Sequence, residues 1–508
     1  MTMTMTMPSI TVFPTRKVSK INRNIYSGFT EHMGRCIYGG IYDPSNPNKD
    51  LIDRDGFRRD VIDALKPLEV PVFRYPGGNF CATYHWQDGI GPRDQRPSRP
   101  ELAWDNVETN QFGTDEFMAW CKAVDAEPYL CLNFGTGTLD EAMAWVEYCN
   151  GTKDTYYANL RRKNGHEDPY RVKYWALGNE MWGPWQVCQM TAEAYAERAL
   201  QWAKALKLLD PTIQLVLCGK EGATSWDHHV LKHCLQPAGL SDLGEERVPL
   251  IDMHSIHLYT ASEEHYENVT APLAAERSIE VAAALIDLAV VENQIPPTQK
   301  RPTVCFDEWN VWLPTRAVGS RGAEESYTLS DALAVAVWLN VLVRKSGDVG
   351  MACIAQSVNV ISPLMTTPTG LVRQTTWWAY ELFCRFMKGH QIAVHLDCAA
   401  SYTGPTKPAW VRALKPTPWL DVSATLDETG WVNLCVVNIH AEQDLETTLG
   451  GVDASHGEVY TVTGPHLNVT NMAGKEEVGL HKSEWDPNKS STFVFPKSSI
   501  TMLRWQTS

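Results

Sequence analysis

The sequence of residues 172–180 is VKYWALGNE, an apolar run of β-forming residues that ends in a glutamate. Residues 303–310, TVCFDEWN, show the same pattern, because a second apolar run ends in acidic residues followed by tryptophan. Short apolar runs without strict alternation are typical of strands buried on both faces, as in a parallel sheet. The two stretches therefore predict parallel strands that each end in a carboxylate.

Six further runs of this kind lie between about residues 25 and 380, separated by helix-like patterns. The predicted strands are Gly28–His32, Val72–Gly77, Pro128–Asn133, Val172–Glu180, Ile213–Gly219, Asp252–Tyr259, Pro302–Trp309 and Met351–Gln356. The helix-like stretches include Phe57–Lys66, Thr114–Ala123, Thr138–Cys149, Ala192–Leu209, Ala274–Val291 and Leu329–Val343. Eight strand–helix units over about 350 residues predict a (β/α)₈ TIM barrel with enlarged loops.

The pattern changes after about Cys384, where short alternating segments are separated by Gly, Pro, Asn and Asp. Such segments predict a C-terminal antiparallel β-sandwich. The segment Ser9–Val18 is also β-prone and is predicted to add a strand to this sandwich. We therefore expect an N-terminal strand in residues 1–20, a catalytic barrel in 21–383 and a sandwich in 384–508.

Composition excludes some classes of partner. The formal net charge of −15 argues against nucleic acid or an anionic membrane surface as the main partner, because both favour basic patches. The sequence contains no run of about 18 apolar residues, so no membrane span is predicted. The 19 Trp and 18 Tyr suit stacking against sugar rings, and they suit a large core equally well.

The cysteines bear on the compartment. There are 13, an odd number, scattered along the chain without a C-x-x-C pair, and several lie inside apolar runs. A buried free thiol behaves as a small hydrophobic group, so this pattern favours a reducing compartment over a disulfide framework. The N-terminal stretch also lacks a basic start followed by an apolar segment. We expect a cytoplasmic protein.

Two glutamates are the candidate catalytic residues. In a TIM barrel the active site lies at the C-terminal ends of the strands, and Glu180 and Glu308 end the fourth and seventh predicted strands. These strands lie on opposite sides of the barrel, so the carboxylates are expected to face each other. Glycoside hydrolysis requires such a pair, one proton donor and one nucleophile or stabiliser of the anomeric carbon. The alternative is that each is simply a charge at a strand end.

Motifs for bound groups are missing from the sequence. It has no G-x-S-x-G elbow and no Walker loop, and Gly77-Gly78 lacks the strand–helix context of a dinucleotide site. His229 and His233 have a spacing that can bind zinc, but no H-E-x-x-H motif accompanies them. We predict neither a metal nor a cofactor. His257, which alternates with His254 along one predicted strand, is expected to form orienting hydrogen bonds.

An ordered set of motifs runs through the predicted barrel. It comprises GFTEHMGR at 28–35, RYPGGNF at 74–80, YHW at 84–86, DGIGP at 88–92, ETN at 108–110, WALGNEM at 175–181, EWNVW at 308–312 and AQSVNVI at 355–361. Together these motifs resemble the α-L-arabinofuranosidases of glycoside hydrolase family 51, which are retaining enzymes of clan A. The resemblance covers the whole barrel and is weak in the sandwich.

The resemblance implies roles at the reacting centre. Glu180 would be the general acid/base, and Glu308 the nucleophile that forms a covalent arabinosyl-enzyme. Tyr259 would donate a hydrogen bond to Glu308 and orient it. Arg74 would pair with Glu308 and keep it ionised.

The resemblance also implies the residues that bind the sugar. Trp104 would wall the subsite, and Trp182 would contribute from the loop after the fourth strand. The sugar hydroxyls would be held by Asn179 at the 2-position and elsewhere by Glu31, Asn79 and Gln356. Without the resemblance several of these have structural interpretations: Glu31 as an ion-pair partner, Asn79 as a turn residue, Gln356 as a buried hydrogen bonder and Tyr259 as core.

The predicted function is that of a retaining, exo-acting α-L-arabinofuranosidase. It would release terminal arabinofuranose from arabinan, arabinoxylan or derived oligosaccharides, without nucleic-acid or membrane partners. Family members commonly form hexamers, so a homo-oligomer is implied. One alternative is another clan A glycosidase, a β-xylosidase or an endoglucanase. The other is a non-catalytic carbohydrate-binding protein, although such a protein would be expected to have lost one glutamate.

Overall fold

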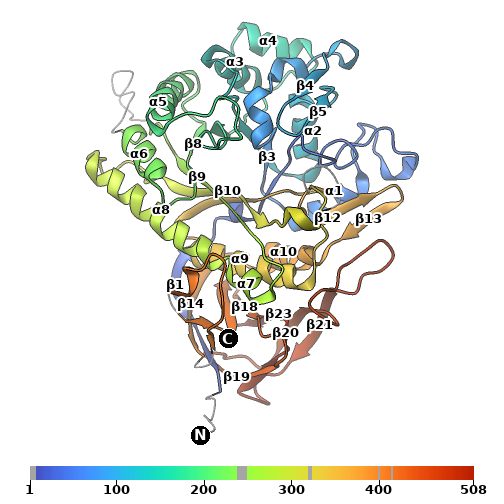
Figure 1. Cartoon of the computed structure of the whole chain (residues 1–508), viewed down its shortest axis with the longest axis vertical. Coiled ribbons are helices and arrows are strands. Elements are labelled where there is room, and N and C mark those ends of the chain that lie inside the picture. The colour runs from blue at the N-terminus through green and yellow to red at the C-terminus, as the bar shows by residue number, and fades with distance from the viewer. Residues whose placement is uncertain (1–6, 237–248, 318–322, 399–400, 414–415, 508) are drawn as a thin grey trace.

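The computed structural model describes residues 7–236, 249–317, 323–398, 401–413 and 416–507, which form a barrel and a β-sheet domain (Figure 1). The barrel is closed, and all its strands are parallel, in the order β10-β11-β2-β3-β6-β7-β8-β9. These strands are β2 (Ser27–Phe29), β3 (Val72–Tyr75), β6 (Glu127–Cys131), β7 (Tyr174–Leu177), β8 (Gln214–Cys218), β9 (Met253–Thr260), β10 (Thr303–Val311) and β11 (Val349–Ile354). Each overlaps one predicted run, so the predicted barrel is confirmed.

Helices surround the barrel and separate it from the sheet domain (Figure 1). They are α1 (Arg59–Leu65), α2 (Thr114–Val124), α3 (Leu139–Asn150), α4 (Tyr156–Lys163), α5 (Ala192–Leu209), α6 (Ser225–Cys234), α7 (His265–Thr270), α8 (Leu273–Glu292), α9 (Leu329–Arg344) and α10 (Thr375–Phe386). Small hairpins join β4 (Arg99–Glu101) to β5 (Asn106–Glu108), β12 (Leu364–Thr367) to β13 (Gly370–Arg373) and β15 (Ser401–Tyr402) to β16 (Thr417–Pro418).

Helix α9 forms extensive contacts with both domains. Every residue from Leu329 to Val343 is buried, because the helix packs on β10 of the barrel and on β17, β18 and β23 of the sheet. A helix that is apolar on all sides requires such cover. Thr328 and Asp331 form a capping box that fixes its start.

The sheet domain contains nine strands in the order β21-β20-β23-β18-β17-β14-β1-β19-β22. All neighbours are antiparallel except β1 and β19, so the N-terminal strand lies inside the C-terminal sheet. The bounds are β1 (Ser9–Lys20), β14 (His390–Asp397), β17 (Leu420–Leu426), β18 (Trp431–Asn438), β19 (Leu445–Gly450), β20 (Gly457–Thr463), β21 (Gly479–Trp485), β22 (Thr492–Phe495) and β23 (Ser499–Gln506).

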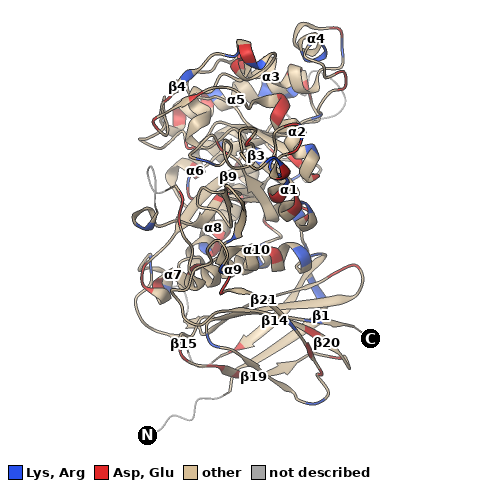
Figure 2. Cartoon of the chain, turned by 90° about the vertical axis from the view of Figure 1, so that its right-hand side faces the viewer, with Lys and Arg blue, Asp and Glu red and all other residues tan. Residues whose placement is uncertain are grey.

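The sheet curls over a core of its own. Leu449 of β19 and Val459 of β20 come from distant positions in the strand order, yet both belong to the same hydrophobic cluster. Side chains along β18 alternate between two clusters: Leu434 and Val436 face this core, while Cys435 between them joins the cluster that contains α9. Figure 2 shows the curled sheet beneath α9 and α10, with acidic and basic residues interspersed.

No helix among the described residues combines the length and the apolar composition needed to cross a bilayer.

Candidate active site

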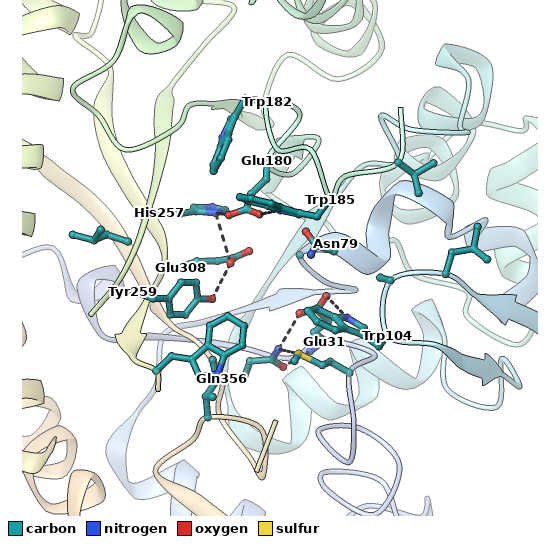
Figure 3. Close-up of a pocket in the computed structure, with 18 of the residues that line it drawn as sticks. Glu31, Asn79, Trp104, Glu180, Trp182, Trp185, His257, Tyr259, Glu308 and Gln356 are labelled. Atoms are coloured by element: carbon teal, nitrogen blue, oxygen red, sulfur yellow. Dashed lines mark hydrogen bonds and ion pairs between the residues drawn. The ribbon is translucent and has the colours of Figure 1, made fainter. Parts of the chain in front are cut away.

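The C-terminal ends of the barrel strands surround a cavity of about 600 Å³ (Figure 3). Nine of the predicted site residues line it: Glu31, Asn79, Trp104, Glu180, Trp182, His257, Tyr259, Glu308 and Gln356. Other lining residues include Met33, Trp185, Trp312 and Ile361. The two remaining predicted residues, Arg74 and Asn179, are buried next to these side chains.

The two candidate catalytic carboxylates face each other across the cavity. One oxygen of Glu180 and one of Glu308 lie within 4.8 Å of each other. Glu180 follows β7 in the left-handed backbone region, with φ of 43°, two residues after Gly178 with φ of 84°. A non-glycine residue in this region is strained, and such strain concentrates at functional sites. The tight turn places the carboxylate over the barrel mouth.

Glu308 reaches the cavity because β10 contains an irregularity. Cys305 pairs with Ser255 of β9, but Glu308 pairs with His257, so three steps along β10 match two along β9. An extra residue of this kind changes the direction in which side chains point. Asp307 and Glu308 therefore both form contacts inside the barrel, although consecutive strand residues normally point to opposite faces.

Arg74, at the end of β3, holds the candidate nucleophile from below. Its Nη1 lies 2.6 Å from Glu308 Oε1, its Nη2 2.7 Å from Asn179 Oδ1 and its Nε 3.4 Å from Asp307. Burial alone would lower the pKa of Arg74, but the charges of Asp307 and Glu308 raise it well above its usual range. The structure thus brings Arg74 and Glu308 together as the resemblance implied.

His257, on β9, links both carboxylates. Its Nδ1 lies 3.0 Å from Glu180 Oε1 and 3.6 Å from Glu308 Oε2, and its Nε2 lies 3.1 Å from Asp307. Burial would lower the pKa of His257, but the charges of Glu308 and Asp307 outweigh it and raise that pKa to about 10. Burial likewise opposes ionisation of Asp307, yet Arg74 and His257 hold its pKa well below the usual range. The imidazole is therefore a fixed cation that donates from both nitrogens.

Tyr259 orients the candidate nucleophile. Its hydroxyl donates to Glu308 Oε2 at 2.8 Å, and Trp312 packs edge-on against its ring at 5.2 Å. Burial and the charge of Glu308 raise the pKa of Tyr259 well above 10, so the phenol keeps its proton. The structure thus brings Tyr259 and Glu308 together as the resemblance implied.

Glu31 lies at the other end of the cavity, in the loop after β2. Its Oε1 accepts from Trp104 Nε1 at 3.1 Å and from Phe80 N at 3.3 Å, and its Oε2 accepts from Gln356 Nε2 at 2.9 Å. Burial and the charge of Glu308 raise the pKa of Glu31 to about 8, although the donors from Trp104 and Phe80 oppose the rise. Trp104, Glu31 and Gln356 together form a polar wall that can accept and donate to sugar hydroxyls.

The raised pKa of Glu31 predicts a pH-dependent difference in stability for Glu31→Gln. An unfolded glutamate loses its proton near pH 4.5, whereas folded Glu31 keeps it until about pH 8, so this residue lowers stability increasingly across that window. Glutamine does not titrate. The melting temperature of Glu31→Gln minus that of the wild type is therefore expected to increase from pH 5 to pH 8 in calorimetry.

Glu221→Gln provides the matched control, since Glu221 is an exposed carboxylate of the same cavity. The difference between Glu221→Gln and the wild type gives the baseline from which the trend for Glu31→Gln is measured. A flat difference for Glu31→Gln would contradict the raised pKa.

Asn79 and Asn179 differ in whether their side chains reach the cavity. Asn79 begins a 3₁₀ turn (Asn79–Thr83) and lines the cavity. Asn179 is only 1% exposed, and its amide is engaged by Arg74 on one side and by Asn79 and Gln186, at 3.4 and 3.3 Å, on the other. Its assignment to the sugar 2-hydroxyl stays a prediction. Within the structure it connects Arg74 to Asn79.

Two residues of the site were not predicted. Trp185 donates from Nε1 to Glu180 Oε2 at 2.6 Å, and Asp307 binds Ser255, Tyr129, His257 and Arg74. Trp182, which was predicted, donates instead to the Gly219 carbonyl at 2.9 Å. Proximity in sequence to Glu180 and Glu308 was the available signal for both missed residues.

Among the described residues, potential metal ligands come together in the cavity. One group brings three ligand atoms within 4.8 Å of one another, and it consists of Glu180, His257 and Glu308. His229 and His233 stack on α6 with ring centroids 6.3 Å apart and belong to no such group in the described chain.

Comparisons with known proteins agree with this geometry. Residues 64–272 match the model of the α-L-arabinofuranosidase 1 domain, and residues 307–499 match that of the α-L-arabinofuranosidase C-terminal domain. A protein of Aspergillus terreus named probable α-L-arabinofuranosidase C is 68% identical over 98% of this chain and 97% of its own. An intracellular exo-α-(1→5)-L-arabinofuranosidase of Halalkalibacterium halodurans is 34% identical over 95% and 94%.

A solved structure extends the likeness to three dimensions. The α-L-arabinofuranosidase of Thermotoga maritima, crystallised with arabinose, has a TM-score of 0.86 and 37% identity, covering 98% of this chain and 100% of that one. Its fold spans the barrel and the sheet domain alike. The chain therefore belongs to glycoside hydrolase family 51, and it is a glycoside hydrolase of the α-L-arabinofuranosidase type.

Proposed function

We propose that this arabinofuranosidase works by double displacement with retention of configuration, with Glu180 as general acid/base and Glu308 as nucleophile. The observation that carries the proposal is the distance of at most 4.8 Å between one oxygen of each carboxylate. Retaining glycosidases separate their carboxyl groups by about 5–5.5 Å, whereas inverting enzymes need about 6.5–9.5 Å to admit a water molecule. The short distance favours direct attack by Glu308.

In the first step, Glu308 attacks the anomeric carbon while Glu180 transfers its proton to the departing glycosidic oxygen. The C–O bond to the leaving group breaks, and an ester between Glu308 and arabinose forms. In the second step, Glu180 takes a proton from water, and the water oxygen displaces Glu308 from the anomeric carbon. Two displacements restore the original configuration, and Glu180 ends the cycle protonated.

The surrounding groups support these two roles. Arg74 and Tyr259 direct the oxygens of Glu308 toward the cavity, and His257 lies between the two carboxylates. Glu31, Asn79 and Gln356 are proposed to bind furanose hydroxyls, with Trp104 as the wall of the subsite. These binding groups are neutral or acidic, which suits a neutral polyol.

The proposed substrates are arabinose-containing glycans: arabinan, arabinoxylan and the oligosaccharides derived from them. The names of the relatives support this class, and the Halalkalibacterium enzyme is named for exo action on α-(1→5) linkages. We propose exo action here as well.

We also propose a cytoplasmic location. All 13 cysteines lie among the described residues, where no disulfide joins them and 11 are buried, which supports a reducing compartment.

An NMR time course tests the proposal. The wild type is incubated with p-nitrophenyl α-L-arabinofuranoside, and the first-formed anomer of arabinose is recorded before mutarotation. Retention requires the α-anomer, and initial formation of the β-anomer would overturn the mechanism. A parallel assay on p-nitrophenyl β-D-xyloside distinguishes the arabinofuranosidase from a β-xylosidase with the same carboxylate pair.

A further inference from the structure

Trp185 lies beside Glu180 at the mouth of the cavity (Figure 3). The residue is 54% exposed, yet its indole nitrogen lies 2.6 Å from Glu180 Oε2. A short hydrogen bond at so exposed a position indicates that the loop after β7 directs the ring onto the carboxylate.

The loop is shaped to hold the indole there. A Cβ at Gly183 would lie 2.7 Å from the Trp185 ring, so glycine is what leaves room for it. Gly183 N donates to the Glu180 carbonyl at 2.7 Å, which closes the turn between the two residues. Trp182 packs edge-on against Trp185, with ring centroids 5.2 Å apart. Three local contacts thus place the Trp185 ring beside Glu180 while leaving it exposed at the cavity mouth.

Trp185 completes a pair of donors around Glu180. His257 Nδ1 lies 3.0 Å from Oε1, and the Trp185 N–H takes Oε2. An indole nitrogen can only donate, and the doubly protonated imidazole of His257 also donates. Hydrogen bonds to an ionised acceptor are about twice as strong as those to a neutral one. Each oxygen of Glu180 thus has one of these two groups as its partner.

The acid step requires Glu180 in its protonated form. A proton on Glu180 must point at the leaving-group oxygen, so one donor has to release its oxygen. His257 is only 6% exposed and is anchored through Nε2 by Asp307 at 3.1 Å and by Ser255 at 3.2 Å. Trp185, exposed at the cavity mouth, is the donor that can move aside.

We infer that Trp185 is a positioning residue that binds Oε2 of the acid/base in the free enzyme and yields this oxygen to the leaving-group oxygen when a substrate binds. The inference rests on the proposed role of Glu180. The other titratable groups that act on Glu180 among the described residues are Glu308 on β10, Tyr259 on β9 and Cys218 on β8, and Glu221 lines the same cavity. They are unchanged in the variants below.

The test is Trp185→Phe, which keeps a ring and removes the N–H. The alkaline limb of kcat/KM against pH reports ionisation of the essential acid in the free enzyme. Loss of the donor is expected to shift this limb upward by about 0.5 to 1 pH unit, since the exposed bond is weaker than a buried one. The substrate is an unactivated arabino-oligosaccharide. A dinitrophenyl arabinofuranoside needs no proton from Glu180. With this substrate, the alkaline part of the kcat/KM profile should be the same for Trp185→Phe and the wild type.

Trp410→Phe is the matched control, because Trp410 is a tryptophan of similar exposure, 46%, that does not line the cavity. Its limb should coincide with that of the wild type. Trp185→Ala is a second variant without the N–H, and it should shift the alkaline limb of kcat/KM as Trp185→Phe does. Coincidence of the Trp185→Phe limb with the wild type to within about 0.2 pH unit, in protein with an unchanged melting temperature, would overturn the inference. Full turnover by Glu180→Ala would instead overturn the proposed function.

Discussion

Replacement of Glu308 by alanine is expected to reduce kcat by roughly 10⁴- to 10⁶-fold, the range seen when a catalytic nucleophile is removed. The reason is specific to this position. Arg74 and Tyr259 direct one donor to each oxygen of Glu308, so the carboxylate is held ready to attack. Asp307, the next carboxylate along β10, is bonded to Ser255 and His257 and cannot replace it. Initial rates with p-nitrophenyl α-L-arabinofuranoside measure the loss.

Glu308→Gln distinguishes loss of the nucleophile from disturbance of the fold. Glutamine keeps the shape of the side chain and an oxygen for Arg74, so its fold should be retained, but it cannot form the ester. Both variants are expected to be inactive, and azide added to Glu308→Ala should yield an arabinosyl azide of inverted configuration, because the anion attacks directly. Turnover within tenfold of the wild type, in protein with an unchanged melting temperature, would place the nucleophile elsewhere.

The barrel could be predicted from the sequence because its signals are local. Each strand is an apolar run of a few residues. Helix α5, which the Thr191 side chain caps, begins and ends at its predicted residues, Ala192 and Leu209. The short helix α4 and the helix α10 were not predicted. Helix α10 starts Thr-Thr-Trp-Trp, residues of modest helix propensity, and it is stabilised instead by packing against α9.

The arrangement of the sheet domain depends on contacts distant in sequence. A β-prone segment at Ser9–Val18 can be recognised, but its parallel pairing with β19 joins residues more than 400 positions apart. Neither turn residues nor alternation specify such a partner. The curl that brings Leu449 and Val459 into one core is likewise a property of the whole sheet.

In the active site, too, some features follow from local sequence patterns and others depend on the folded structure. Glu180 and Glu308 could be found because strand ends meet at the mouth of any such barrel, whatever the loops do. Alternation along β10 would have turned Asp307 and Glu308 to opposite faces, and only the irregular pairing with β9 brings both inside. The Trp185–Glu180 bond depends on a turn with a left-handed residue at Glu180 and on Gly183, which no pattern in the sequence specifies.

Replacement of Glu180 by alanine is expected to produce a loss that depends on the leaving group. Arabino-oligosaccharides need a proton on the departing oxygen, so kcat/KM should fall by about 10²- to 10⁴-fold. A 2,4-dinitrophenyl arabinofuranoside leaves without protonation, and its kcat/KM should change little. Its kcat should still fall, because the arabinosyl ester on Glu308 lacks the base that activates water. Steady-state kinetics on the two substrates measure this split.

Azide then tests the assignment, because the anion needs no general base. In the wild type the ionised Glu180 repels azide, whereas alanine removes that charge and opens the space above the ester. Azide is expected to accelerate turnover of the dinitrophenyl substrate by Glu180→Ala and to yield an arabinosyl azide of retained configuration. Trp182→Phe, altered in the same loop but with Glu180 intact, should show no acceleration. An inverted azide from Glu180→Ala would mean that no covalent intermediate precedes attack, and an absence of acceleration would assign the acid/base to another residue.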